Sequence, residues 1–313
     1  MIKAVTWGWN SRRGSYQTKE AKISLSLLLS KINLSHVILA FGAVQKTAFS
    51  TEINYEGIET PSKEEIREII REIHRNNKKV ILKPTVNCLD GTWRAHINFF
   101  DIDVPCEPKW SEWFESYRNY ILEFSKLAEE EKCEMFVIGC EMVQTDRRES
   151  EWRELIKSVR KHYSGLITYN CDKYQENNIL WWDALDYISS SGYYPIGTWE
   201  QNLKRIEKVV KKFNKPFMFM EVGCPSIKDN GKFPNKWDML RIPDIEEQRK
   251  FYEELFEECQ LFKFVRGYGV WDWPVKLYDL NKAEKNCDYS FYGKPAEAII
   301  IKNFNSMEEL CQI

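Results

Sequence analysis

The chain has 313 residues, enough for one large domain or two ordinary ones, and its 43% hydrophobic and 29% charged residues are typical of a globular protein with a large core. A net charge of −2 provides no basic surface for nucleic acid or for an anionic membrane. No apolar run reaches the roughly 18 residues that a membrane-spanning helix needs.

Eight short apolar segments have the character of strands that are buried on both faces. In chain order they cover residues 4–9, 36–41, 80–85, 135–141, 166–170, 187–192, 217–221 and 267–273. Segments with helical periodicity lie between and after them, at residues 21–32, 62–73, 110–130, 152–159, around 180, at 203–213, 245–260 and 295–301. The alternation of strand and helix predicts a parallel sheet.

Two of the predicted helices show specific local signals. In 21–32, Ile23, Leu27 and Leu28 are expected to share one apolar face. In the helix that begins after Ser62, Glu65 stands three residues further on, which is the spacing of a capping box.

Eight strand–helix units in a chain of this length predict a single (β/α)8 barrel domain over residues 1–313. The rival architecture, a doubly wound open sheet, usually carries a glycine-rich phosphate turn after its first strand. The sequence Trp-Asn-Ser-Arg-Arg-Gly at 9–14 is not such a turn, so the barrel is preferred.

Two of the predicted strands end in a carboxylate. The fourth, Met-Phe-Val-Ile-Gly-Cys-Glu, ends at Glu141, and the seventh, Phe-Met-Phe-Met-Glu, ends at Glu221. The carboxyl ends of barrel strands form the active face. Either Glu alone could pair with an Arg or cap a helix, because a buried carboxylate needs a partner. Two at one barrel mouth indicate the pair of acids that cleaves a glycosidic bond.

Aromatic residues make up 14% of the chain, with 12 Trp. Many will pack in the core, but sugar rings also stack on aromatic faces, so the composition favours a carbohydrate partner. The nine cysteines are irregularly spaced without a Cys-x-x-Cys pair, and the N-terminus lacks the features of a signal peptide. We therefore expect reduced thiols in a cytoplasmic protein. With four His and none at ligand spacing, we expect no metal.

Short motifs in a consistent order cover most of the chain. They are Lys-Pro at 83–84, Trp-Arg at 93–94, Phe-Val-Ile-Gly-Cys-Glu-Met at 136–142, Glu-Trp-Arg-Glu-Leu-Ile at 151–156, Val-Arg at 159–160, Leu-Ile-Thr-Tyr at 166–169, Trp-Asp-Ala-Leu-Asp-Tyr at 182–187 and Tyr-Tyr-Pro at 193–195. The pattern resembles the clan of retaining glycosidases built on (β/α)8 barrels, and within it glycoside hydrolase family 113, the β-mannanases.

The resemblance implies roles for the two acids. Glu141 would be the acid/base and Glu221 the nucleophile, with no cofactor. A nucleophile must be ionised, so a donor or cation should lie beside it; the candidates are Tyr193, where the clan places a Tyr, and Lys83. Much of the clan has Asn before the acid/base, whereas this chain has Cys140, a poor donor. The contact to the sugar 2-hydroxyl is thus unassigned, which is compatible with the axial hydroxyl of mannosides.

The remaining candidate sugar-binding residues come from predicted strand ends and long loops. They are Trp7, Asn87, Trp93, Arg94, Trp271 and Trp273, with Asn170, Asp172 and Trp237 as weaker candidates. Trp9 has the same ambiguity as Trp7, because core packing is expected for one of the two. Strand alternation is expected to send Trp271 and Trp273 to the same side.

The sequence therefore predicts a retaining β-glycosidase acting on β-1,4-mannan or β-mannooligosaccharides, with imported oligosaccharides favoured by the lack of a signal peptide. One alternative is a glycosidase of the same clan that acts on β-glucosides, xylosides or amino sugars. Another is a sugar-binding barrel without catalytic activity.

Overall fold

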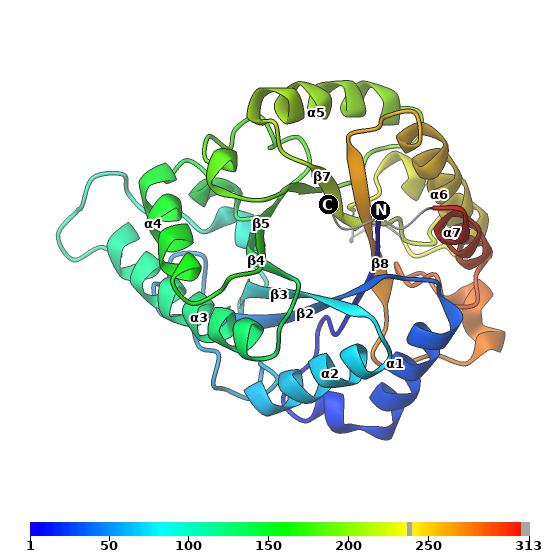
Figure 1. The fold of residues 1–313 in the computed structure, drawn as a ribbon, viewed down its shortest axis with the longest axis horizontal. Coiled ribbons are helices and arrows are strands. Elements are labelled where there is room, and N and C mark those ends of the chain that lie inside the picture. The colour runs from blue at the N-terminus through cyan, green and yellow to red at the C-terminus, as the bar shows by residue number, and fades with distance from the viewer. Residues whose placement is uncertain (237–239, 308–313) are drawn as a thin grey trace.

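The computed structural model describes residues 1–236 and 240–307. Eight parallel strands close into a barrel in sequence order, and the helices surround it (Figure 1). The strands are β1 (Ile2–Trp7), β2 (His36–Gln45), β3 (Lys79–Cys88), β4 (Met135–Cys140), β5 (Leu166–Cys171), β6 (Ile188–Ser191), β7 (Phe217–Val222) and β8 (Val265–Trp273). The α-helices are α1 (Lys19–Lys31), α2 (Lys63–Arg75), α3 (Trp110–Glu130), α4 (Glu149–Arg160), α5 (Trp199–Phe213), α6 (Ile245–Cys259) and α7 (Pro295–Ser306). The predicted (β/α)8 barrel is confirmed.

The strands alternate between two hydrophobic clusters, which is why they read as continuous apolar runs. Inward-facing side chains fill the barrel interior, among them Ala4, Ile38, Val137 and Met218. Outward-facing side chains join the helices in a much larger cluster between the barrel wall and the helical ring. Polar side chains appear where the inward-facing positions reach the carboxyl ends of the strands.

Local signals were predicted with mixed success. The capping box of α2 is present, with Ser62 and Glu65 satisfying each other's backbone N–H groups. In α1 the predicted face is only partly confirmed, because Leu28 is buried in the core whereas Ile23 is 53% exposed. The buried positions of α1 instead follow the helical repeat from Ala21, and they are Ala21, Ser24, Leu25, Leu28 and Leu29.

Between β5 and β6 the described chain forms a short 3-10 turn, Trp182–Ala184, where a short helical piece was predicted around residue 180. Two Trp side chains, Trp181 and Trp182, are fully buried there. They cover the barrel wall in place of a longer helix. Among the described residues, no helix is long and apolar enough to cross a membrane.

Candidate active site

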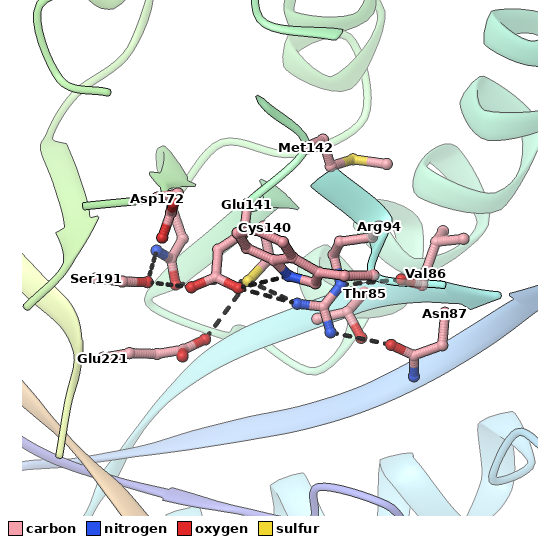
Figure 2. A network of polar contacts seen from close by, with 12 residues as sticks. Thr85, Val86, Asn87, Arg94, Cys140, Glu141, Met142, Asp172, Ser191 and Glu221 are labelled. Carbon is pink, nitrogen blue, oxygen red and sulfur yellow. Dashed lines mark hydrogen bonds and ion pairs between the residues drawn. The ribbon is translucent and has the colours of Figure 1, made fainter. Parts of the chain in front are cut away.

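A cavity of about 930 Å³ opens at the carboxyl ends of the strands. Glu141, directly after β4, and Glu221, in β7, both line it. Figure 2 shows their carboxylates directed toward the same space. Both side chains are largely buried, at 8% and 5% residue exposure, so their charges are weakly screened.

Glu221 is surrounded by donors. The Lys83 ammonium, which is fully buried, forms an ion pair with Glu221 Oε1. The Tyr193 hydroxyl donates to Oε2 at 2.7 Å. The Cys140 thiol lies 3.4 Å from Oε1. These contacts favour the ionised carboxylate.

Glu141 receives different donors on its two oxygens. The Ser191 hydroxyl donates to Oε1 at 2.6 Å. Trp93 Nε1 and an Arg94 guanidinium nitrogen each lie 3.3 Å from Oε2. Trp93 and Arg94 both line the cavity, so Oε2 receives its donors from the cavity wall.

The two carboxyl groups have opposite pKa shifts. Burial, and then the negative charge of Glu221, raises the pKa of Glu141, while Arg94 and Ser191 oppose this rise. Burial would also raise the pKa of Glu221, but the charge and hydrogen bond of Lys83 and the hydrogen bond of Tyr193 outweigh it and lower the pKa below its ordinary value. One group is therefore suited to hold a proton and the other to remain an anion.

A buried chain of hydrogen bonds joins the two acids beneath the cavity. Lys83 donates to Asn170 Oδ1 at 2.7 Å, in addition to its ion pair with Glu221. The Asn170 amide nitrogen donates to Ser191 Oγ at 3.1 Å, and Ser191 donates in turn to Glu141. Because each donor in this chain is fully buried, the relative placement of the two carboxylates is held from below.

The family model of glycoside hydrolase family 113 matches residues 5–294. The chain belongs to glycoside hydrolase family 113. It is thus a member of an enzyme family, and the two acids lie in the cavity of a glycoside hydrolase. No curated protein sequence matches the chain.

Solved structures agree with this family 113 assignment. A structure of a GH113 β-1,4-mannanase is 52% identical, with a TM-score of 0.96 and coverage of 98% of this chain and 99% of its own. The GH113 β-mannanase AaManA from Alicyclobacillus acidocaldarius, in complex with ManMIm, is 38% identical, with a TM-score of 0.94 and 97% of each chain covered. A β-D-glucuronidase of Dictyoglomus thermophilum, 15% identical with a TM-score of 0.67, covers 98% of this chain and 51% of its own and shares the fold alone.

Most of the predicted binding residues of this family 113 glycoside hydrolase gather at the cavity. Asn87, Trp93, Arg94, Tyr193 and Trp271 line it. Arg94 is held in place by Asn87, which accepts a hydrogen bond from it at 2.9 Å. Its guanidinium also lies over the Trp9 ring, 5.3 Å from the centroid.

Lys83 and Asn170 lie one layer deeper. Both are fully buried, and their polar atoms face Glu221, Ser191 and each other. They shape the site through the two acids, and the lining of the cavity does not include them.

Trp7 and Trp273, which were predicted to bind sugar, lie away from the cavity. Both are buried in the cluster between barrel and helices, where the indole N–H groups bond to Ser24, at 3.3 Å to its hydroxyl and 3.2 Å to its carbonyl. In the pairing of β1 with β8, Val5 opposes Val270 while Trp7 opposes Trp273, so β8 carries one extra residue. Such a bulge reverses the alternation, and Trp271 and Trp273 therefore face opposite sides.

Some residues at the site were not among the main candidates that the sequence predicted. Trp9, which shared the ambiguity of Trp7, lines the cavity and contacts Trp271 edge to face, with ring centroids 5.3 Å apart. Asp172 also lines the cavity. Ser191 was missed, although three successive serines at 189–191 in a buried strand are an unusual signal. Trp237 lies outside the described residues.

The side chain of Cys140, which stands where much of the clan has Asn, has three polar neighbours. Its thiol lies 3.7 Å from Asn170 Oδ1 and 3.7 Å from the Arg94 guanidinium, in addition to its contact with Glu221. Burial raises the pKa of this thiol, so it remains protonated and neutral beside the two acids. Among the described residues, no cluster of His, Cys, Asp or Glu is arranged to hold a metal ion.

Proposed function

We propose that this chain is a retaining β-mannanase-type hydrolase that cleaves β-1,4-mannan or β-mannooligosaccharides, with residues 1–313 as one catalytic domain. The observation that carries the mechanism is the opposite pKa shift of two acids in one cavity. The substrate class is supported by the similar proteins of 52% and 38% identity that are described as β-mannanases.

In the first step, a Glu221 carboxylate oxygen attacks the anomeric carbon. The bond from that carbon to the leaving oxygen breaks, and Glu141 transfers its proton to this oxygen. Lys83 and Tyr193 hold Glu221 ionised before the attack. The product is a covalent glycosyl-enzyme and a released sugar chain.

In the second step, water attacks the anomeric carbon while Glu141 accepts its proton, and Glu221 leaves as a carboxylate. Once Glu221 is esterified its negative charge is gone, and with it one of the causes that raise the pKa of Glu141. The pKa of Glu141 should therefore fall after the first step, which suits a group that changes from acid to base.

Aromatic rings of the cavity provide a stacking surface for the sugar. Trp9 and Trp271 form one wall, and Trp93 stands at the open side beside Glu141. We assign this wall to substrate binding, together with Asn87, Arg94 and Tyr193.

Substrate choice is tested by measuring hydrolysis of mannohexaose and of a panel of aryl β-mannosides, β-glucosides, β-xylosides and N-acetyl-β-glucosaminides. We expect the mannosides to be cleaved with the highest kcat/KM. A glucoside cleaved as fast as the matched mannoside would overturn the substrate assignment in favour of the same-clan alternative. Absence of hydrolysis on every substrate would favour a binding protein. Product analysis on mannohexaose over time then separates release of single mannose units from internal cleavage.

We also propose a cytoplasmic location, with imported mannooligosaccharides as the substrates. Eight cysteines among the described residues are free thiols, and most of them are buried. A protein of an oxidising compartment more often pairs its cysteines. Cell fractionation with detection of the untagged protein tests this, and recovery from the culture medium would contradict it.

The buried cation Lys83 should control the acidic limb of the pH profile. In Lys83→Met the ion pair with Glu221 is lost, so the pKa of Glu221 rises; the pKa of Glu141 rises less, because Lys83 lowers it only from a distance. We expect kcat/KM on mannohexaose to fall about 100-fold or more, because less of the Glu221 nucleophile is ionised without its counter-charge.

The direction of the pH shift is the sharper readout. The acidic limb reports ionisation of Glu221, so it should move to higher pH in Lys83→Met. Lys79→Met, at the opposite end of the same strand, is the control and should keep the wild-type profile. An acidic limb that stays in place in Lys83→Met would show that another group keeps Glu221 ionised.

A further inference from the structure

The backbone of Glu141 is in an unusual conformation. Its φ is +51°, in the left-handed region that residues with a side chain rarely adopt. Left-handed residues of this kind persist only where the surroundings impose them. The contacts that impose this turn therefore decide where the Glu141 carboxyl group points.

Two hydrogen bonds hold the turn on either side of the residue. The Glu141 N–H donates to the Asn170 carbonyl at 2.8 Å, which continues the pairing of β4 with β5. The next N–H, that of Met142, donates to the hydroxyl of Tyr169 at 3.0 Å. The second bond comes from a side chain, so it can be removed without changing the backbone of β5.

The Tyr169 hydroxyl is itself fixed by an acceptor. It donates to Asp146 Oδ1 at 2.6 Å, and both residues are buried. With its proton committed to Asp146, the oxygen presents its lone pairs to the Met142 N–H. The Tyr169 hydroxyl thus connects the Met142 N–H to Asp146, the residue that follows the 3-10 turn Val143–Thr145.

The Tyr169 ring is held just as closely. It packs against Trp152 and Trp181, with centroid distances of 5.1 and 5.0 Å. A Cβ added to Gly139 would approach the ring to 2.9 Å, so the strand that leads to Glu141 lies directly on it. Tyr169 does not line the cavity and is too deep to meet a substrate.

We propose that Tyr169, anchored by Asp146, is a positioning residue that holds the left-handed turn at Glu141 and thereby directs its carboxyl group to the glycosidic oxygen. The inference rests on the acid/base role proposed for Glu141. Tyr169 acts only through Glu141, so its removal should weaken proton transfer and leave substrate binding unchanged.

The test compares Tyr169→Phe with Tyr163→Phe. Tyr163 is a buried tyrosine whose hydroxyl donates to the Cys133 carbonyl at 2.7 Å, before β4 begins and away from the cavity. Both variants lose one buried hydroxyl and should lose thermal stability. On mannohexaose, Tyr169→Phe should lower kcat about 10- to 100-fold with KM within about twofold of wild type, because small misplacement of a catalytic group costs this much. Tyr163→Phe should keep the wild-type kcat.

A second substrate separates positioning from general damage. A 2,4-dinitrophenyl β-mannoside needs no proton on its leaving group, and added azide needs no base, so together they bypass Glu141 in both steps. Under these conditions Tyr169→Phe should approach the wild-type rate. An equal loss on both substrates, or a kcat on mannohexaose equal to that of Tyr163→Phe, would overturn the inference.

Asp146→Asn provides the same test with the tyrosine in place, should Tyr169→Phe fail to fold. An amide then replaces the carboxyl group that accepts from the Tyr169 hydroxyl, and we expect a smaller loss of kcat that dinitrophenyl mannoside and azide again remove. No loss of kcat in this variant would contradict the role of Asp146. If dinitrophenyl mannoside and azide did not restore the rate of Glu141→Ala, the acid/base role of Glu141 would fail. If they restored the rate of Glu141→Ala but not that of Tyr169→Phe, only the positioning role of Tyr169 would fail.

Discussion

Glu221→Ala is expected to lower kcat on mannohexaose by about 10⁵-fold, because loss of a covalent nucleophile removes the reaction path itself. Lys83 and Tyr193 would lose the acceptor that they share, and no other described carboxylate forms an ion pair with Lys83. The measurement is the initial rate on mannohexaose and on an activated aryl mannoside. Both should be lost, since a better leaving group does not replace the nucleophile.

Two controls make the Glu221→Ala result specific. Azide should occupy the space of the missing carboxylate and attack in its place, giving an α-glycosyl azide with inverted configuration. The double variant Lys83→Met/Glu221→Ala removes the unpaired buried charge and should unfold with a free energy about 1–3 kcal/mol higher than Glu221→Ala alone. Substantial hydrolysis by a well-folded Glu221→Ala protein would exclude Glu221 as the nucleophile.

Glu141→Ala is expected to depend on the leaving group. On mannohexaose, whose leaving oxygen needs a proton, kcat should fall about 10³-fold. On a 2,4-dinitrophenyl mannoside the first step should continue at near the wild-type rate, while the second step, without its base, becomes limiting. The glycosyl-enzyme should then accumulate and KM should fall with kcat.

Azide distinguishes Glu141 from Glu221. In Glu141→Ala, azide should attack the glycosyl-enzyme without a base, restore turnover of the activated substrate and give a β-glycosyl azide, because two inversions retain configuration. Equal losses on both substrates without azide rescue would contradict the acid/base role. The opposite configurations of the azide products in the two variants would together establish a retaining mechanism.

Glu141 and Glu221 can take different catalytic roles because the groups around them differ. Glu141 and Glu221 share one buried cavity, yet Lys83 touches only Glu221, and Arg94 lies at 3.3 Å from Glu141. Burial favours a higher pKa at both groups. At Glu221, Lys83 and Tyr193 outweigh this effect and lower the pKa, whereas at Glu141 Arg94 and Ser191 do not outweigh burial and the charge of Glu221. The wild-type pH profile should therefore be a bell whose acidic limb reports Glu221 and whose basic limb reports Glu141.

Parts of this architecture were predictable from local pattern. Apolar runs separated by helical periods predicted the barrel, and the position of Glu141 and Glu221 at the ends of their strands placed both at one mouth. The α2 capping box was also predictable, because its two partners are three residues apart. In α1 the prediction placed Leu28 correctly but Ile23 wrongly, because small residues, Ala21 and Ser24, form part of the buried face and carry a weak hydrophobic signal.

Other features depend on which strands pair and in what register. The bulge of β8 against β1 turns Trp273 into the core and leaves Trp271 in the cavity, and it is invisible within either strand alone. The sequence by itself determined the barrel and its two acids, because strand periodicity and strand ends are local properties. Only the closed barrel decided that Trp9 rather than Trp7 meets the cavity, that Lys83 reaches Glu221, and that Ser191 and Tyr169 hold Glu141, because these contacts join strands far apart in the chain.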